Sequence, residues 1–72
     1  MKVKVQYSGG PSRYSDQAVD CMLAEIRGVE LYAEAPADPA DDTATYDTLK
    51  AEILRQAEAA EIPAAELQFF YD

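Results

Sequence analysis

Four aspartates, Asp38, Asp41, Asp42 and Asp47, lie close together and could offer carboxylates to a metal ion. Calcium takes six to eight oxygen ligands, and its loops need a glycine in the turn and a glutamate at the closing position. This segment has neither. We therefore expect the aspartates to cap a helix and solvate a loop, and we predict no metal and no cofactor. The chain has one cysteine, Cys21, and no histidine, so the usual ligands of zinc and the members of a catalytic triad are lacking.

A second candidate for chemistry is the stretch Ser8-Gly9-Gly10-Pro11-Ser12. It is similar to the SGGxDS pyrophosphate loop of ATP pyrophosphatases, and the resemblance implies backbone N–H groups that cradle a phosphate before a helix. The aspartate of that pattern is replaced, and Pro11 has no N–H to donate. We expect a turn that ends a strand, with a phosphate- or nucleotide-binding remnant as an alternative.

The longest periodic segment is Thr43 to Ile62, which predicts an amphipathic helix. Its apolar residues recur at the spacing of one helical face, and Pro63 cannot continue it. These residues are Tyr46, Leu49, Ile53, Ala57 and Ala60.

Four further segments complete the predicted fold. Lys2–Tyr7, Val29–Ala35 and Glu66–Asp72 alternate apolar and polar residues, as strands with one solvated face do. Ser15–Arg27 has an apolar stripe at helical spacing, and Gly28 suits the left-handed residue that follows a helix. We therefore expect a small α+β or α/β two-layer sandwich of order β-α-β-α-β, with both helices on one face of a three-stranded sheet. Residues 1–72 form one domain.

Composition limits the classes of partner. The net charge is −8, and residues 37–72 hold nine acidic and two basic side chains, for a net charge of −7. Direct nucleic-acid binding needs Lys and Arg to neutralise phosphates, so we do not expect it. The sequence has no run of about 18 apolar residues, so we expect no membrane span. The single cysteine suits a cytoplasmic protein.

The acidic, alanine-rich and compact profile looks like that of small phage-encoded inhibitors of the anti-CRISPR kind, in composition alone. The resemblance implies a non-enzymatic protein in a host cytoplasm that binds a basic, nucleic-acid-binding surface of a defence complex. Carboxylates would stand in for phosphates, and aromatic residues on the solvated sheet face would add contact area. The expected partner-binding residues are Asp38, Asp41, Asp42, Asp47, Glu58, Tyr32 and Phe70. The alternative is a host regulatory or adaptor domain that dimerises or augments a partner's sheet. A monomer and a homodimer are both compatible with the sequence.

Overall fold

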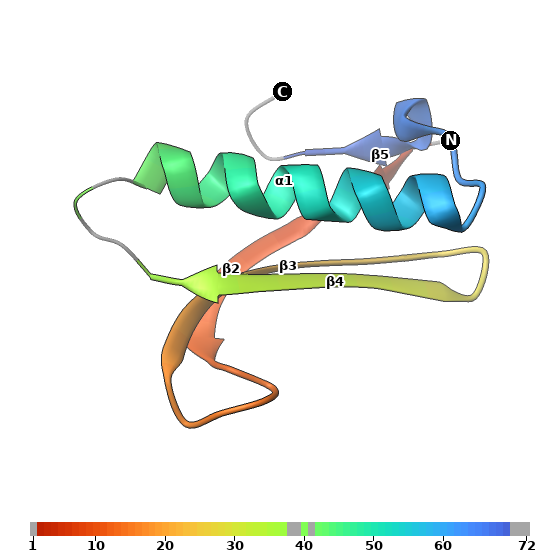
Figure 1. Cartoon of the computed structure of the whole chain (residues 1–72). Helices are drawn as coiled ribbons and strands as arrows, with labels where there is room; N and C mark the ends of the chain where they lie inside the picture. The colour runs from red at the N-terminus through yellow and green to blue at the C-terminus, as the bar shows by residue number, and fades with distance from the viewer. Residues whose placement is uncertain (1, 38–39, 41, 70–72) are drawn as a thin grey trace.

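The computed structural model describes residues 2–37, 40 and 42–69. They form an α+β fold in which one long helix lies across one face of a small sheet (Figure 1). The elements in chain order are β1 (Val3–Lys4), β2 (Gln6–Pro11), β3 (Ala18–Ile26), β4 (Val29–Pro36), α1 (Asp42–Ala59), the 3-10 turn η1 (Ala64–Glu66) and β5 (Leu67–Gln68).

The sheet is built from two consecutive antiparallel hairpins in the order β2-β3-β4. Met22 at its centre lies opposite Tyr7 on one side and Ala33 on the other. At the start of the chain, β1 pairs in parallel with β5, with Val3 opposite Leu67. The N–H of Val5 extends this pairing with a 2.9 Å bond to the carbonyl of Gln68. The first residues of the chain therefore pair with β5 through β1 and with β3 through β2.

The prediction of a helix from Ser15 to Arg27 is wrong, because Ala18–Ile26 is the central strand β3. Its apolar residues fit both periods: Val19, Met22 and Ile26 suit a helical stripe, while Met22, Ala24 and Ile26 alternate as in a strand. As a strand, β3 buries Met22, Ala24 and Ile26 beneath α1 and satisfies the backbone groups of two neighbouring strands. The order is therefore not β-α-β-α-β, and the described residues contain one α-helix.

Gly28 adopts the left-handed conformation that the sequence predicts, but in a hairpin rather than after a helix. Arg27 and Gly28 have φ values of 54° and 77°, and they connect the paired residues Ile26 and Val29. Two successive positive φ angles are typical of the type I′ turn, whose twist matches that of the strands it joins.

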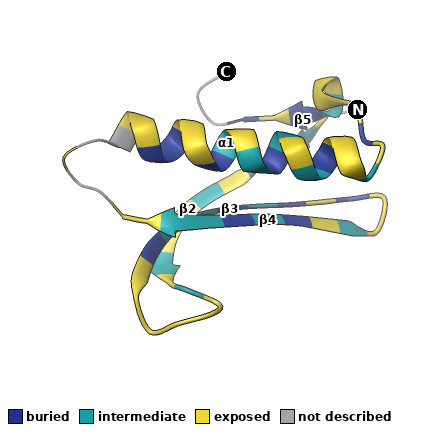
Figure 2. Ribbon diagram, in the orientation of Figure 1, coloured by how far each residue is buried: buried dark blue, intermediate teal, exposed yellow. Residues whose placement is uncertain are grey.

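The core lies between α1 and the sheet, as the inward faces of both elements in Figure 2 show. Five apolar residues of the periodic segments predicted from the sequence are at most 5% exposed: Val5, Leu31, Leu49, Ile53 and Phe69. The core thus confirms the predicted phase of α1, of the first strand and of β4. No helix in the described part of the chain is long and apolar enough to cross a membrane.

Within the described residues, the C-terminal strand is shorter than predicted. Leu67 and Gln68 are its paired residues, and Ala64–Glu66 forms a 3-10 turn. Leu67 and Phe69 are nevertheless buried, so the predicted inward face is correct. Residues 70–72 of the predicted strand lie outside the described residues.

Candidate protein-interaction site

The face of the sheet away from α1, here called the open face, carries Gln6, Ser8, Cys21, Leu23, Tyr32 and Glu34. These residues alternate with the buried ones and share one side by register. The loop between β2 and β3 curls beneath this face (Figure 1). Its residues therefore approach the side chains of β4 from below.

Glu34 is the centre of the contact between loop and strand. Its carboxylate accepts hydrogen bonds from the Ser12 hydroxyl, from the Arg13 backbone N–H at 3.1 Å and from the Tyr32 hydroxyl at 2.7 Å. Arg13 also donates to Glu30 at 2.6 Å, and its guanidinium lies 3.9 Å from the ring centroid of Tyr32. Tyr14, which is 79% exposed, meets the same ring edge-on. The open face thus presents an ordered group of aromatic and charged side chains.

These hydrogen bonds shift the pKa values of Glu34 and Tyr32 in opposite directions. The Ser12 and Tyr32 hydroxyls lower the pKa of Glu34, with a further contribution from the Arg13 N–H. The bond to the Glu34 carboxylate raises the pKa of Tyr32 to about 12. Glu34 therefore stays ionised and Tyr32 stays protonated near neutral pH, so this site carries a fixed negative charge.

The edge of β4 is partly covered by a side chain of α1. The Gln56 amide accepts a 3.0 Å hydrogen bond from the Tyr32 N–H and donates a 2.7 Å bond to the Tyr32 carbonyl. One side chain thus satisfies both backbone groups of Tyr32, as a residue of a neighbouring strand would.

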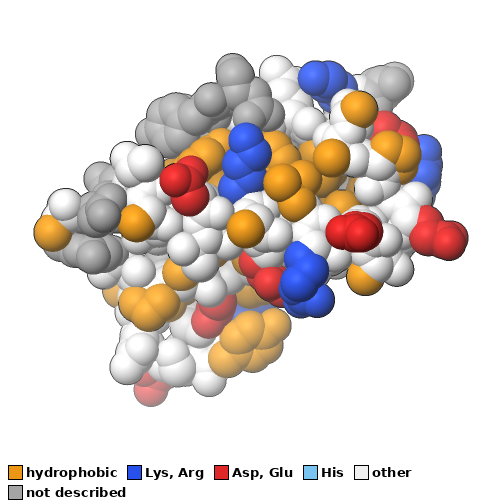
Figure 3. All heavy atoms as spheres, turned by 45° about the horizontal axis from the view of Figure 1, so that its top comes forward, with side chains coloured by type: hydrophobic (Ala, Val, Ile, Leu, Met, Phe, Trp, Pro, Cys, Tyr) orange, Lys and Arg blue, Asp and Glu red, His pale blue; other side chains and the backbone are white. Residues whose placement is uncertain are grey.

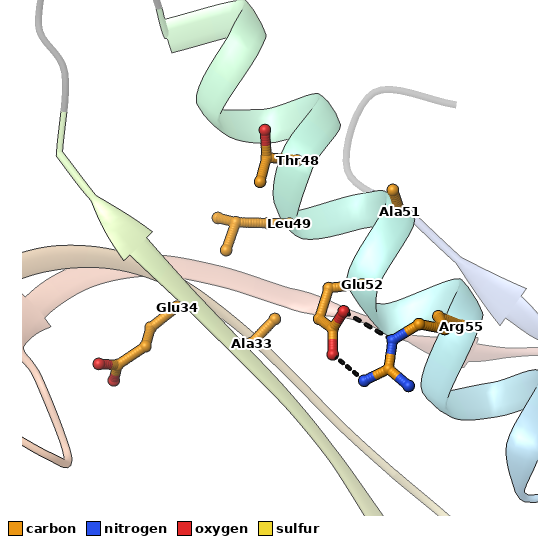
Figure 4. Close-up of a pocket in the computed structure, with 7 residues that line it drawn as sticks. All are labelled: Ala33, Glu34, Thr48, Leu49, Ala51, Glu52 and Arg55. Atoms are coloured by element: carbon orange, nitrogen blue, oxygen red, sulfur yellow. Dashed lines mark hydrogen bonds and ion pairs between the residues drawn. The ribbon is translucent and has the colours of Figure 1, made fainter.

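Beyond Tyr32, a groove separates the β4 edge from α1 (Figure 4). Ala33 and Glu34 line one wall, and Leu49, Ala51 and Glu52 lie on the other. In Figure 4 the side chain of Ala33 points toward α1, whereas that of Glu34 points away from it. The groove continues past Thr48 to a second hollow, lined by Ala35, Pro36, Ala37, Ala44 and Thr45. Small side chains on both walls leave this part of the edge open.

Within the groove, Arg55 donates to both carboxylate oxygens of Glu52. The Arg55 guanidinium, followed by the Gln56 amide, lowers the pKa of Glu52 to about 2. This pair is locally neutral, and the Glu34 carboxylate beside the groove lies on the open face.

The arginines of the described residues are all in ion pairs. They pair as Arg13 with Glu30, Arg27 with Glu66 and Arg55 with Glu52. Carboxylates without an ion pair in this part of the chain belong to Asp16, Asp20, Glu25, Glu34, Asp47, Glu58 and Glu61. Charges of both signs are interspersed among hydrophobic side chains over the α1 side of the molecule (Figure 3). The free charge is thus mainly negative, without one concentrated acidic patch on this side.

The structure brings some of the predicted partner-binding residues together and separates others. Asp47 and Glu58 are exposed on α1, and their eleven-residue separation places them on one helical face, about 16 Å apart along the axis. Tyr32 lies on the open face, in the group around Glu34. Asp38, Asp41, Phe70 and the side chain of Asp42 lie outside the described residues.

The other candidates for chemistry take different roles. The prediction of a turn at residues 8–12 is wrong, because Gly9, Gly10 and Pro11 belong to β2 and pair with β3. Since β2 leads into a hairpin rather than a helix, the arrangement expected of a phosphate loop is absent there. Cys21 lies on a strand instead of a helix and contacts the Ser8 hydroxyl at 3.4 Å. The described residues include no acidic, cysteine or histidine cluster suited to a metal ion.

Sequence reasoning missed three residues of this site: Ser12, Arg13 and Gln56. The alternation of Glu30, Tyr32 and Glu34 places those three on one face, but nothing in the sequence indicates that a hairpin loop reaches them. The Gln56 contact spans 24 positions and depends on the angle between α1 and β4.

Comparison with known proteins assigns no family or function to this chain. No protein-family model matches it, and neither a curated protein nor a solved structure gives a significant match.

Proposed function

We propose that this protein is a non-enzymatic, acidic interaction module that binds a basic surface of a partner protein. The observation that carries the proposal is the distribution of ion pairs. Each described arginine is neutralised within the molecule, while Asp47 and Glu58 remain exposed and unpaired on one face of α1.

Such a charge distribution favours association with cationic surfaces. Unpaired carboxylates steer a basic partner toward the molecule and speed association, an effect that salt weakens. Basic surfaces of this kind commonly bind nucleic-acid phosphates. With the compositional resemblance to inhibitors of the anti-CRISPR kind, this makes a nucleic-acid-binding defence complex the target class that we propose.

The proposal can be tested by affinity capture from a host lysate. The parent protein should retain a partner at low salt and release it at high salt or on addition of single-stranded nucleic acid, which competes for the same basic surface. The double variant Asp47→Lys, Glu58→Lys should capture less of that partner. Asp16→Lys, Glu25→Lys has the same net charge and is the matched control, because it changes the loop and β3 instead of α1.

Two results would contradict the proposal. One is a partner that stays bound in the presence of both salt and nucleic acid. The other is equal capture by the parent and the α1 double variant.

A second candidate function, an adaptor that augments a partner's sheet, is favoured by the open edge of β4.

A further inference from the structure

The backbone N–H and C=O groups of successive β4 residues point alternately toward β3 and toward the groove. In a two-residue hairpin, Ile26 and Val29 exchange hydrogen bonds, so every second residue from Val29 bonds to β3. The N–H and C=O of Glu30, Tyr32, Glu34 and Pro36 therefore face outward, except that proline has no N–H. The bonds between Tyr32 and Gln56 show this direction independently.

Gln56 covers the edge at Tyr32 and leaves the next outward residue open. No hydrogen bond from the described residues reaches the backbone N–H or C=O of Glu34, or the C=O of Pro36. Unpaired groups on a strand edge are a template for another strand, and the groove beside them gives that strand space. The opposite edge of the sheet, on β2, contains Pro11, whose missing N–H makes it a poorer template.

We propose that the β4 edge from Glu34 to Pro36 binds an extended segment of a partner protein in which basic and small apolar side chains alternate. The segment adds a strand to the sheet and lies in the groove beside α1. This inference rests on the proposed function, because it names the part of the basic partner that is bound.

The required alternation follows from the two faces of β4. Side chains of an added strand lie about 5 Å from those directly opposite them. On the open face, the opposite residue meets the ionised Glu34, which favours Lys or Arg. On the α1 side, the neighbouring residues meet Ala33, Leu49 and Ala51, which leave room for a small apolar side chain. A second copy of this chain fits less well, because each copy has a net charge of −8.

The test uses a short capped peptide of alternating Lys and Val, and a control peptide of the same composition with its lysines in one block. The alternating peptide should bind the parent protein about tenfold more tightly or better, a difference of about 1.4 kcal/mol. It should also slow hydrogen exchange at the Glu34 amide. Equal affinity for the two peptides overturns strand addition but leaves the electrostatic proposal standing. No binding of the alternating peptide overturns the inference as well, whatever the lysate experiment shows.

Backbone methylation of the peptide tests the hydrogen bonds directly. In a strand, N–H groups point alternately toward β4 and away from it. N-methylation at the central lysine and at the adjacent valine should therefore have unequal effects, with a loss of about tenfold or more in one peptide. Equal effects of the two methylations would overturn the inference.

Two variants of the protein complete the design. Gln56→Ala exposes the N–H and C=O of Tyr32, so it should bind the alternating peptide more tightly. Glu34→Gln removes the fixed charge and should bind it more weakly, whereas Glu66→Gln, at the far end of the molecule, should bind as the parent does. Thermal melts confirm that each variant is folded. Weaker or unchanged binding by a folded Gln56→Ala variant would overturn the proposal.

Discussion

The guanidinium of Arg13 lies 3.9 Å from the ring centroid of Tyr32 and fastens the β2–β3 loop to the open face of the sheet. The same residue pairs with Glu30 through its side chain and with Glu34 through its backbone N–H. Three kinds of contact therefore depend on the position of one loop residue. The fixed arrangement of side chains on the open face therefore depends on where Arg13 lies.

Replacing Arg13 should loosen the loop without unfolding the domain. In Arg13→Ala, the stacking and the ion pair are lost, so the amide of residue 13 should exchange with solvent faster than in the parent. The amide of Met22 in β3 should be unaffected. Arg13→Lys retains the charge but not the planar stacking group, and it should give an intermediate rate. Unchanged exchange at residue 13 in the alanine variant would show that Arg13 does not hold the loop.

Tyr32 should make stability sensitive to alkaline pH. Its pKa is about 12 in the folded protein and about 10 in an unfolded chain. The folded state binds the proton more tightly, so this stabilisation is complete below pH 10 and declines as the pH rises through 12. Tyrosinate absorbance should include a late-titrating component that disappears in Tyr32→Phe. A variant that retains this component would assign it to another tyrosine.

Glu34 should have the opposite effect at acid pH. Hydrogen bonds from Ser12 and Tyr32 lower its pKa in the folded protein. Its stabilising contribution is therefore present above the unfolded value of about 4.3 and is lost as the pH falls through the folded pKa. Carboxyl NMR should show the pKa of Glu34 below the ordinary value of about 4.3. In Ser12→Ala its midpoint should move upward, and a constant midpoint would contradict the assigned cause.

The parts of the fold that the sequence predicts correctly are those that fit a single period. The apolar positions of α1 suit a helix but not a strand, and Leu31 and Ala33 of β4 alternate clearly. Residues 18–26 fit both periods, and their local pattern does not distinguish a helix from a strand. The choice is made by distant residues, because β2 and β4 pair with both edges of β3.

The candidate site was less predictable than the core, for a related reason. Glu34 and Tyr32 are two positions apart, so their common face follows from strand geometry. Ser12 reaches Glu34 across 22 positions, and this contact exists because the loop curls beneath the sheet. A backbone edge has no side-chain signature at all, so the open part of β4 becomes visible only once the strand order is known.

The core prediction concerns Ile53, which is fully buried between α1 and the sheet. Ile53→Ala should reduce the free energy of unfolding by about 2–5 kcal/mol, through lost transfer energy and a residual cavity. Ile53→Val removes one methylene at the same place and should cost about 0.5–1.5 kcal/mol. Chemical denaturation of the two variants measures both losses, and the loss in the alanine variant should be the larger. An alanine variant as stable as the parent would mean that the helix packs on another face.

The end of α1 offers a substitution that should stabilise the protein. Glu61 has a φ of 61°, the Ile62 N–H bonds to the Ala57 carbonyl at 2.8 Å, and the Glu61 N–H bonds to the Glu58 carbonyl. This is the Schellman arrangement, whose left-handed position usually holds glycine. A side chain there costs about 1–2 kcal/mol, and the acidic group lies unfavourably at the negative end of the helix.

Glu61→Gly relieves both costs. Part of the gain is offset by the greater freedom of glycine in the unfolded chain, about 0.4–1 kcal/mol, so the net stabilisation should be about 1 kcal/mol or less. A gain of 1 kcal/mol would raise the melting temperature by about 4–8 °C in a domain of this size. Glu61→Ala separates the two causes, because it removes the charge but keeps the backbone strain, and it should gain less than glycine. Ala59→Gly, inside the last helical turn, should lower stability by about 1 kcal/mol. If both glycine variants melt below the parent, Glu61 does not hold a strained left-handed position.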